Sequence, residues 1–177
     1  MLHIETRTEI SEPALRERTW EIYHTSLGTA QLRSPFRQYM IREEFYQSLD
    51  DPTFLKILLL SGEVLVSILL VATDMSRVSW LSGEYFAYQY PTEYANGQLM
   101  YFAGIGADQT QTPGPRGMVM MLNALIAAYR ERNCCVLFHD YSALVHHLSG
   151  GLGARLAKLN GGEAAEVDTM HFWEIRG

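Results

Sequence analysis

The alternation of hydrophobic and polar positions is clearest over residues 99–132. An apolar run that contains Gly104 and Gly106 opens this stretch and predicts a strand. A polar loop rich in proline and glycine follows at 109–117. Apolar residues then recur at spacings of three and four, which is typical of one face of a helix. They are Met118, Met121, Leu122, Leu125, Ile126 and Tyr129. We therefore predict a strand, a glycine-bearing loop and a long amphipathic helix.

The preceding half of the chain predicts one strand, two helices and a hairpin. Weak alternation over 1–10 indicates an edge strand. Ser11 and Pro13 mark a helix start, and this helix should run to about Thr25, while Ser34 and Pro35 mark a second one that ends near 50–52. Dense apolar runs at 54–60 and 63–72, separated by Ser61 and Gly62, predict two buried strands in a tight hairpin.

The remaining segments are shorter. Residues 78–96 hold six aromatic rings, and we interpret them as a strand plus a loop over one end of the sheet. The apolar run 134–139 predicts a buried strand parallel to the one that precedes the long helix, because a strand–helix–strand unit of this length forms a right-handed crossover. A short helix at 141–149 and strands at 154–160 and 169–176 complete the predicted order.

Length, composition and charge narrow the class of protein. The 177 residues, 47% hydrophobic and 19% charged, fit one globular domain over 1–177. The net charge of −6 argues against a nucleic-acid partner. No secretory signal is evident and the longest apolar run is too short to span a bilayer, so we expect no membrane partner. Cys134 and Cys135 are interpreted as buried, reduced residues of a cytoplasmic protein. The sequence does not decide the oligomeric state, and a homodimer is possible.

The loop at 109–117 is a candidate anion site. A glycine-bearing loop before a helix directs backbone N–H groups and the positive end of the helix dipole at one spot, which suits a phosphate. The sequence is not a Walker A loop, since no Gly-Lys-Ser/Thr follows, and no dinucleotide fingerprint is present.

The same stretch resembles the cofactor-binding core of the GNAT superfamily, the acyl-CoA-dependent N-acyltransferases. In that family a Gln/Arg-x-x-Gly-x-Gly/Ala loop holds the coenzyme A pyrophosphate; here Gln111 and Gly114 match, Arg116 replaces the last small residue, and Gly117 follows one position late. The element order is similar to the GNAT fold, a mixed α/β (α+β) architecture with a mostly antiparallel sheet, one parallel crossover and helices on both faces. A hotdog thioesterase fold is the structural alternative, and the two early helices and the late crossover fit it less well.

The resemblance implies a set of cofactor-binding residues. Backbone groups of Ile105 and Ala107 would pair with the pantetheine amides, in a gap opened by the two strand glycines. Alternatively these glycines only make room for an aromatic ring such as Trp80. The pyrophosphate loop and helix start would be supplied by Gln111, Gly114, Arg116, Gly117 and Met118.

Catalytic candidates follow from the same resemblance. Family members often carry a tyrosine four residues before a Gly-aromatic pair, placed to protonate the departing thiolate; counting back from Gly151 lands on His147 here, with Tyr141 as a second candidate. Glu84 or Asp108 could take the proton of an amine nucleophile. Each of these residues has an ordinary alternative, as a packed histidine, a solvated carboxylate or a loop cap.

No metal site is expected. His139, Asp140, His146 and His147 do not form a four-ligand set at suitable spacing, and Ser142 has no nucleophile-elbow motif around it.

The sequence thus predicts acyl transfer from acetyl-CoA, or another acyl-CoA, to an amine. The acceptor would be a small molecule or a protein, and the aromatic rings of 78–96 would line its pocket, although core packing explains half of them equally well. The alternative is a catalytically inactive GNAT-like domain that binds a small ligand or a partner protein, which the imperfect loop and the missing tyrosine favour.

Overall fold

One mixed sheet organises the molecule. A computed structural model describes residues 1–31, 40–111, 113–140 and 152–167. Within these ranges the sheet has five strands, which lie side by side in the same order as in the sequence, β1-β2-β3-β4-β5. Its strands are β1 (Leu2–Arg7), β2 (Phe54–Ser61), β3 (Val64–Ala72), β4 (Leu99–Ala107) and β5 (Val136–His139). The first four strands pair antiparallel and β5 pairs parallel to β4. The mostly antiparallel sheet with one parallel crossover is as predicted.

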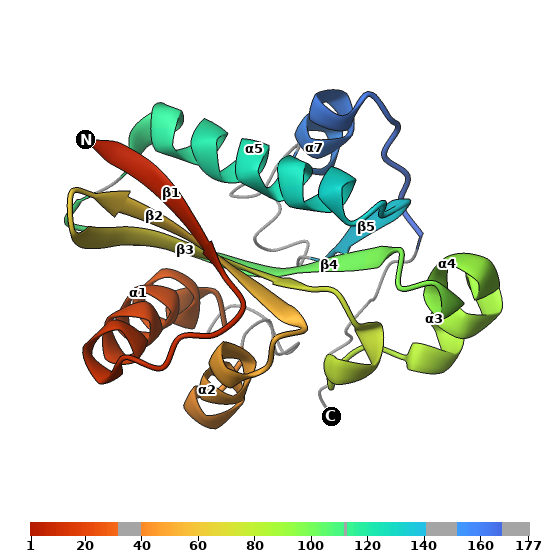
Figure 1. The fold of residues 1–177 in the computed structure, drawn as a ribbon, viewed down its shortest axis with the longest axis horizontal. Helices are drawn as coiled ribbons and strands as arrows, with labels where there is room; N and C mark the ends of the chain where they lie inside the picture. Colours follow the sequence, from red (N-terminus) through yellow and green to blue (C-terminus); the bar gives the residue numbers. More distant parts are fainter. Residues whose placement is uncertain (32–39, 112, 141–151, 168–177) are drawn as a thin grey trace, which may run out of the picture.

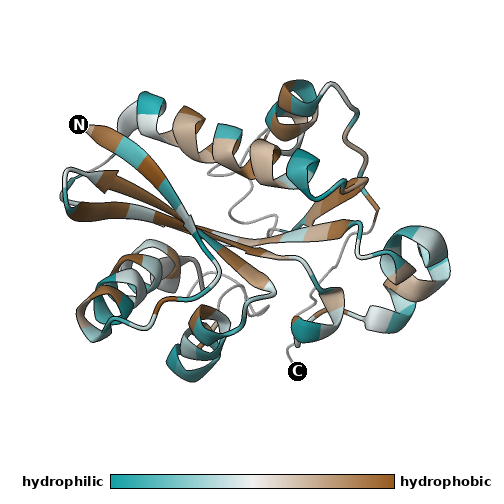
Figure 2. Ribbon diagram, in the orientation of Figure 1, coloured by the Kyte–Doolittle hydropathy of each residue, from teal (hydrophilic) through white to brown (hydrophobic). Residues whose placement is uncertain are grey.

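Helices cover both faces of this sheet (Figure 1). One face carries α1 (Pro13–Gln31) and α2 (Arg42–Asp50), and the other carries α5 (Gly114–Glu131) and α7 (Leu152–Asn160). β2 and β3 are hydrophobic along most of their length because both of their faces are buried (Figure 2). Two apolar cores result, one between the sheet and each helical layer.

The aromatic stretch folds into two short helices rather than a strand. These are α3 (Gly83–Gln89) and α4 (Pro91–Ala95), which follow the short 3₁₀ helix η1 (Met75–Arg77). The Ser82 hydroxyl caps α3 by accepting the N–H of Tyr85 at 3.2 Å. Phe86 and Tyr90 pack edge-on against Phe138 of β5, with ring centroids 4.9 and 5.3 Å away. As predicted, this stretch covers one end of the sheet, by ring packing.

Other element boundaries also differ from the prediction. α1 continues to Gln31, and the N–H of Arg16 bonds to the carbonyl of Glu12, so Glu12 rather than Ser11 is its N-cap residue. α2 begins at Arg42, because Ile41 adopts an extended conformation.

Towards the C-terminus, the expected strand at 154–160 is wrong, since these residues belong to α7. α5 begins at Gly114, inside the predicted loop. The predicted helix at 141–149 and strand at 169–176 lie outside the described residues.

The two cysteines differ in their environment. Both are free thiols, and burial raises the pKa of Cys134. Cys135 is exposed, so the expectation that both are buried is wrong for this residue.

α1 lies directly against β4 because two glycines remove side chains at the contact. A Cβ atom on Gly106 would lie 3.0 Å from the Cα of Tyr23, and one on Gly104 would lie 3.2 Å from the Tyr23 ring. Gly104 also has φ of +154°, which favours glycine. The neighbour of these glycines is therefore α1, not Trp80.

Gly106→Ala should consequently destabilise the fold. The added methyl group meets backbone atoms of Ile22 and Tyr23, which cannot rotate away. We expect the free energy of unfolding to fall by about 1–3 kcal/mol in denaturant titrations. Gly162→Ala is the matched control, since a Cβ there meets no atom within 4 Å. Equal unfolding midpoints for Gly106→Ala and wild type would contradict the close contact.

Lys56 is a buried lysine near the start of β2. Its ammonium donates to the backbone carbonyls of Thr8 and Asp51 at 2.6 and 2.7 Å, and so joins the ends of two loops. Burial lowers the pKa of Lys56 to about 8, against the opposing effect of carboxylates at Asp51, Glu9 and Asp50.

This lysine should make stability depend on pH. Between pH 8 and 10 the unfolded chain, with an ordinary lysine pKa, binds more protons than the folded chain. The free energy of unfolding of wild type should therefore rise over this interval relative to that of Lys56→Met, in parallel denaturant titrations. If the difference in the free energy of unfolding between the two proteins stays constant over this interval, burial does not lower the pKa of the Lys56 ammonium.

Candidate functional site

β4 and β5 part after four paired residues. The parallel ladder joins Leu99–Phe102 to Val136–His139 and ends there. At the same level the pairing of β4 with β3 shifts by one residue, so that Ala103 forms a bulge between Phe102 and Gly104. In the described part of the chain no strand pairs with the outer edge of β4 beyond this bulge.

The backbone alternation of β4 decides which groups face that open edge. The N–H of Asp108 bonds to the carbonyl of Val66 in β3, at 2.9 Å. In an antiparallel pair, successive residues of a strand direct their N–H and C=O groups alternately towards the partner strand and away from it. Because Asp108 faces β3, Ala107 and Ile105 direct these groups away from β3. These are the two residues that the sequence predicted for pantetheine binding.

The two residues are not equally available. The Ala107 N–H donates to the Ser26 hydroxyl, which in turn donates to the Ala107 carbonyl, both at 2.8 Å. Ile105 has no such partner among the described residues. A ligand amide can pair with Ile105 directly, whereas pairing with Ala107 requires that Ser26 moves.

The start of α5 offers fewer donors than an ordinary helix end. Pro113 is its N-cap and Pro115 stands in the first turn, and neither has an N–H. The Gly117 N–H bonds to the Pro113 carbonyl at 3.2 Å. Gly114 and Arg116 therefore supply the backbone donors that face outward from this turn. Gly117 has a packing task instead, since a Cβ there would lie 2.8 Å from Leu59.

Asp108 holds the loop between β4 and α5. One carboxylate oxygen accepts the N–H and the hydroxyl of Thr110 and the N–H of Gln111, and the other pairs with Arg18 of α1. The hydrogen bonds from Thr110, followed by the Arg18 charge, hold the pKa of Asp108 below its ordinary range. Asp108 is thus a loop cap, and it fixes the backbone at Gln111. The side chain of Gln111 is exposed beside a hollow of about 240 Å³ that Pro113 also lines.

A hydrogen-bonded chain of side chains lies where β4 and β5 part. The Trp80 indole N–H donates to the Tyr101 hydroxyl at 2.8 Å, and that hydroxyl donates to the Asp140 carboxylate. Tyr101 is buried, while Asp140 is exposed just after β5. Burial, reinforced by Asp140, raises the pKa of Tyr101, so its hydroxyl stays protonated near neutrality. The chain therefore orients a solvent-accessible carboxylate beside the open edge of β4.

Comparison with known proteins identifies this architecture. No family model and no curated protein matches the chain. Solved structures do: an aminoglycoside acetyltransferase, meta-AAC0020, from an uncultured soil metagenomic sample, in complex with trehalose, superposes with a TM-score of 0.58 at 14% identity, over 99% of this chain and 97% of that one. The chain has the GNAT fold.

Two further structures with this fold are similar over most of their length. FeeM, an N-acyl amino acid synthase from uncultured soil microbes, gives a TM-score of 0.55 at 18% identity, over 86% of this chain and 79% of that one. The aminoglycoside N-acetyltransferase AAC(6')-Iy, in complex with CoA, gives 0.53 at 14% identity, over 99% and 100%. The family resemblance expected from the sequence is confirmed at the level of the GNAT fold.

Within the GNAT fold the structure describes all of the predicted cofactor residues, but of the predicted catalytic residues it describes only Glu84 and Asp108. Ile105 and Ala107 line the open edge, and β4 runs through the Asp108 loop to the exposed start of α5, where Arg116 lies. Met118 is partly buried in the α5 core, and as an interior helical residue its N–H bonds to the carbonyl of Gly114. Glu84 is an exposed residue of the first turn of α3. Tyr141 and His147 lie outside the described residues.

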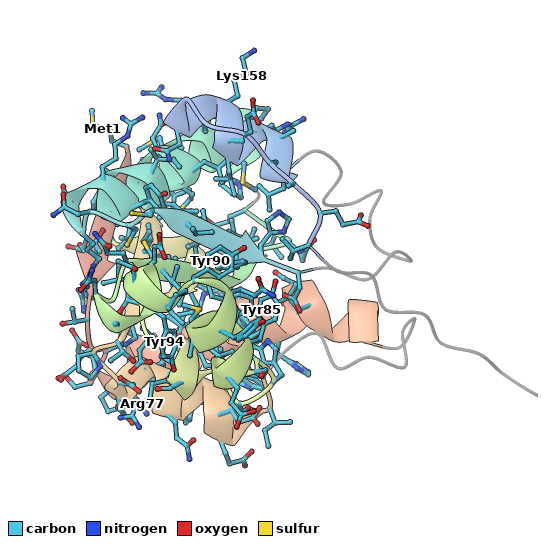
Figure 3. The ribbon with its side chains drawn as sticks, turned by 90° about the vertical axis from the view of Figure 1, so that its right-hand side faces the viewer. Met1, Arg77, Tyr85, Tyr90, Tyr94 and Lys158 are labelled. Atoms are coloured by element: carbon cyan, nitrogen blue, oxygen red, sulfur yellow. The ribbon has the colours of Figure 1, made fainter. Side chains whose placement is uncertain are left out.

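Sequence reasoning missed Tyr101 and set Asp140 aside. Asp140 did carry a signal, since it follows a parallel strand, where active sites collect. Tyr101 carried none, because a tyrosine in an apolar strand reads as core. Figure 3 looks onto this side of the molecule, where α3 with Tyr85, α4 with Tyr94, and Tyr90 between the two helices cover the end of the sheet.

The described residues offer neither a metal site nor a membrane-spanning helix. They contain no group of three or more His, Cys, Asp or Glu side chains that could hold a metal ion. Nor do the described helices include one with the length and apolar character needed to cross a bilayer.

Tyr101→Phe tests the hydrogen-bonded chain. Loss of the hydroxyl leaves the Trp80 N–H without its acceptor in a partly buried position. We expect the free energy of unfolding to fall by about 1–3 kcal/mol, with a changed Trp fluorescence spectrum. Tyr88→Phe is the control, because Tyr88 is 82% exposed and should show neither effect. Identical free energies of unfolding for the two variants would argue against the hydrogen bonds that link Trp80, Tyr101 and Asp140.

Proposed function

We propose that this protein transfers an acyl group, most simply acetyl, from acyl-CoA to a primary amine of a small molecule or a protein. The observation that carries the proposal is the open outer edge of β4 beyond its bulge, next to the exposed start of α5. The edge offers backbone groups to amides, and the helix start offers donors to phosphate. The GNAT fold and the CoA complex of AAC(6')-Iy support acyl-CoA as the co-substrate.

Each part of coenzyme A has a matching group on this chain. The Ile105 backbone would pair with a pantetheine amide, and Ala107 would join it once Ser26 releases its bonds. The N–H groups of Gly114 and Arg116 and the exposed Arg116 guanidinium would hold the pyrophosphate. No metal ion is required by this arrangement.

The reaction needs an acceptor for the amine proton. The amine nitrogen attacks the thioester carbonyl, the C–S bond breaks, and the thiol leaves with a proton. Asp140 is the carboxylate that best fits the task of removing the amine proton, since Tyr101 orients it at the parting of β4 and β5. Glu84 remains the alternative base predicted from the sequence. His147 and Tyr141 remain the residues predicted to protonate the departing thiolate.

A second function is favoured by a specific observation. Two prolines at the start of α5 have no N–H to donate to a phosphate, and the Ala107 N–H is already bonded to the Ser26 hydroxyl. The cofactor site therefore offers a ligand fewer backbone hydrogen bonds than a strand edge and a helix start without these features would. The second candidate is therefore a catalytically silent domain that binds another small ligand or a partner protein on the same scaffold. Isothermal titration with acetyl-CoA and longer acyl-CoAs separates the two, since only the enzyme should release heat.

Arg116→Ala tests the phosphate contact. Removing a charge-assisted contact costs about 1.5–3 kcal/mol, so acetyl-CoA affinity should fall roughly ten- to a hundredfold. The loss should be equal for short and long acyl-CoAs, because all share the phosphates. Thermal stability should hardly change, since Arg116 is exposed.

The control for this variant is Arg132→Ala, an exposed arginine at the other end of α5. It should bind acetyl-CoA as wild type does. Equal affinities for Arg116→Ala and Arg132→Ala would overturn the role assigned to Arg116.

A further inference from the structure

The Ser26 hydroxyl of α1 is bonded to both backbone groups of Ala107, the last residue of β4. Its oxygen accepts the Ala107 N–H at 2.8 Å, and the hydroxyl donates to the Ala107 carbonyl, also at 2.8 Å. The same carbonyl accepts a hydrogen bond from the side-chain amide of Gln109 at 3.2 Å. A carbonyl oxygen has two lone pairs, and an N–H has one proton. The hydrogen-bonding groups of Ala107 are therefore all in use.

The hydroxyl takes the place of an amide at this residue. An amide that lies along a strand edge offers a carbonyl to the N–H of one residue and an N–H to its carbonyl. The Ser26 hydroxyl offers an acceptor and a donor from one atom, so it satisfies the same two groups. Ser26 and Ala107 are 81 positions apart in the sequence, so the contact exists only because α1 packs on β4.

The packing of α1 fixes where this hydroxyl lies. A Cβ atom on Gly106 would lie 3.0 Å from the Cα of Tyr23 and 3.1 Å from the carbonyl oxygen of Ile22, one helical turn before Ser26. The helix backbone is thus as close to β4 as it can be. Ser26 and Ala107 are both half-buried, so solvent reaches their contact and a ligand can compete for it.

The hydroxyl can leave Ala107 without any movement of the helix. A serine inside a helix can rotate its side chain and donate to the carbonyl four residues earlier, which for Ser26 is that of Ile22. The neighbouring Thr25 makes the equivalent bond, to the carbonyl of Glu21 at 2.8 Å. Rotation about one side-chain bond therefore frees the N–H of Ala107 and one lone pair of its carbonyl.

The contact weakens a ligand that needs Ala107 and leaves other ligands unaffected. One hydrogen bond within a protein is favoured over its exchange for water by about a factor of five. A ligand amide that pairs with Ala107 binds only those molecules in which Ser26 is rotated away, and its observed affinity is reduced by that fraction. A ligand that pairs with Ile105 alone displaces no side chain of the described residues.

We propose that Ser26 determines how strongly this protein distinguishes acyl donors that have two amides from donors that have one. The inference rests on the proposed acyl transfer, in which the pantetheine amides pair with Ile105 and Ala107. One amide binds at Ile105 directly, and the other binds at Ala107 in competition with the Ser26 hydroxyl. The wild-type protein therefore gains little affinity from the second amide, and a protein without this hydroxyl gains more.

The test compares two kinds of thioester on two proteins. Acetyl-CoA and acetyl-pantetheine have two amides, and S-acetyl-N-acetylcysteamine has one. Each is titrated into the ¹⁵N-labelled full chain, as wild type and as Ser26→Ala, and the Kd is obtained from the shifts of the backbone amides. We expect Ser26→Ala to bind both two-amide thioesters about fivefold or more tightly than wild type does, and the short thioester equally. The same gain for all three thioesters would overturn the proposal.

Thr25→Ala is the matched control, because the exposed Thr25 hydroxyl donates to carbonyls of its own helix. It should bind every thioester as wild type does, and thermal melts show that both variants are folded. Without any ligand, the Ala107 amide should exchange with solvent faster in Ser26→Ala than in Thr25→Ala, since it has lost its acceptor. Equal exchange rates in the two variants would contradict the contact itself.

The failure of this inference differs from the failure of the proposed acyl transfer. If Ser26→Ala binds acetyl-CoA as tightly as wild type, or more weakly, the role of Ser26 fails and acyl transfer stands. If only Ser26→Ala binds acetyl-CoA, the role of Ser26 stands and the wild-type protein is the silent domain. If neither protein binds acetyl-CoA, both proposals fail.

Discussion

The direct contact between α1 and β4 is the constraint on which the rest of this structure depends. With no side chain at Gly104 and Gly106, the helix backbone comes within about van der Waals distance of the strand. This approach brings Ser26 to the Ala107 backbone and Tyr23 to the bulge. It also lets Arg18 reach Asp108, which holds the loop before α5. The open edge, the bulge and the helix start are therefore fixed relative to one another by one packing contact.

Much of this architecture follows from local pattern, and the rest does not. The hairpin at Gly62 and the parallel crossover are visible because turn residues and dense apolar runs specify them locally. The prediction was wrong for α7 because this nine-residue helix has a single buried residue, Leu156. Its hydrophobic periodicity is therefore too weak to distinguish a helix from a strand. α3 and α4 were misread despite their Ser82 and Pro91 start signals, since their rings suggested a strand.

In the candidate site, too, some features follow from local sequence pattern and others depend on the fold. The backbone groups of Ile105 follow from strand alternation, which the sequence reveals. The Tyr101–Asp140 contact joins residues 39 positions apart in the sequence. Chemistry of this kind needs the fold before it can be seen.

The most direct test of this account is a titration of the ¹⁵N-labelled protein with acetyl-CoA, followed through its backbone amides. Binding at the open edge and the helix start should shift the amides of Ile105, Gly114 and Arg116 most, and should alter Ala107 as Ser26 is displaced. The amides of Tyr88 and Gly162, which belong neither to the open edge nor to the start of α5, should serve as unchanged references. An unaltered spectrum, or shifts confined to residues away from β4 and α5, would contradict the central claim that acyl-CoA binds where β4 parts from β5.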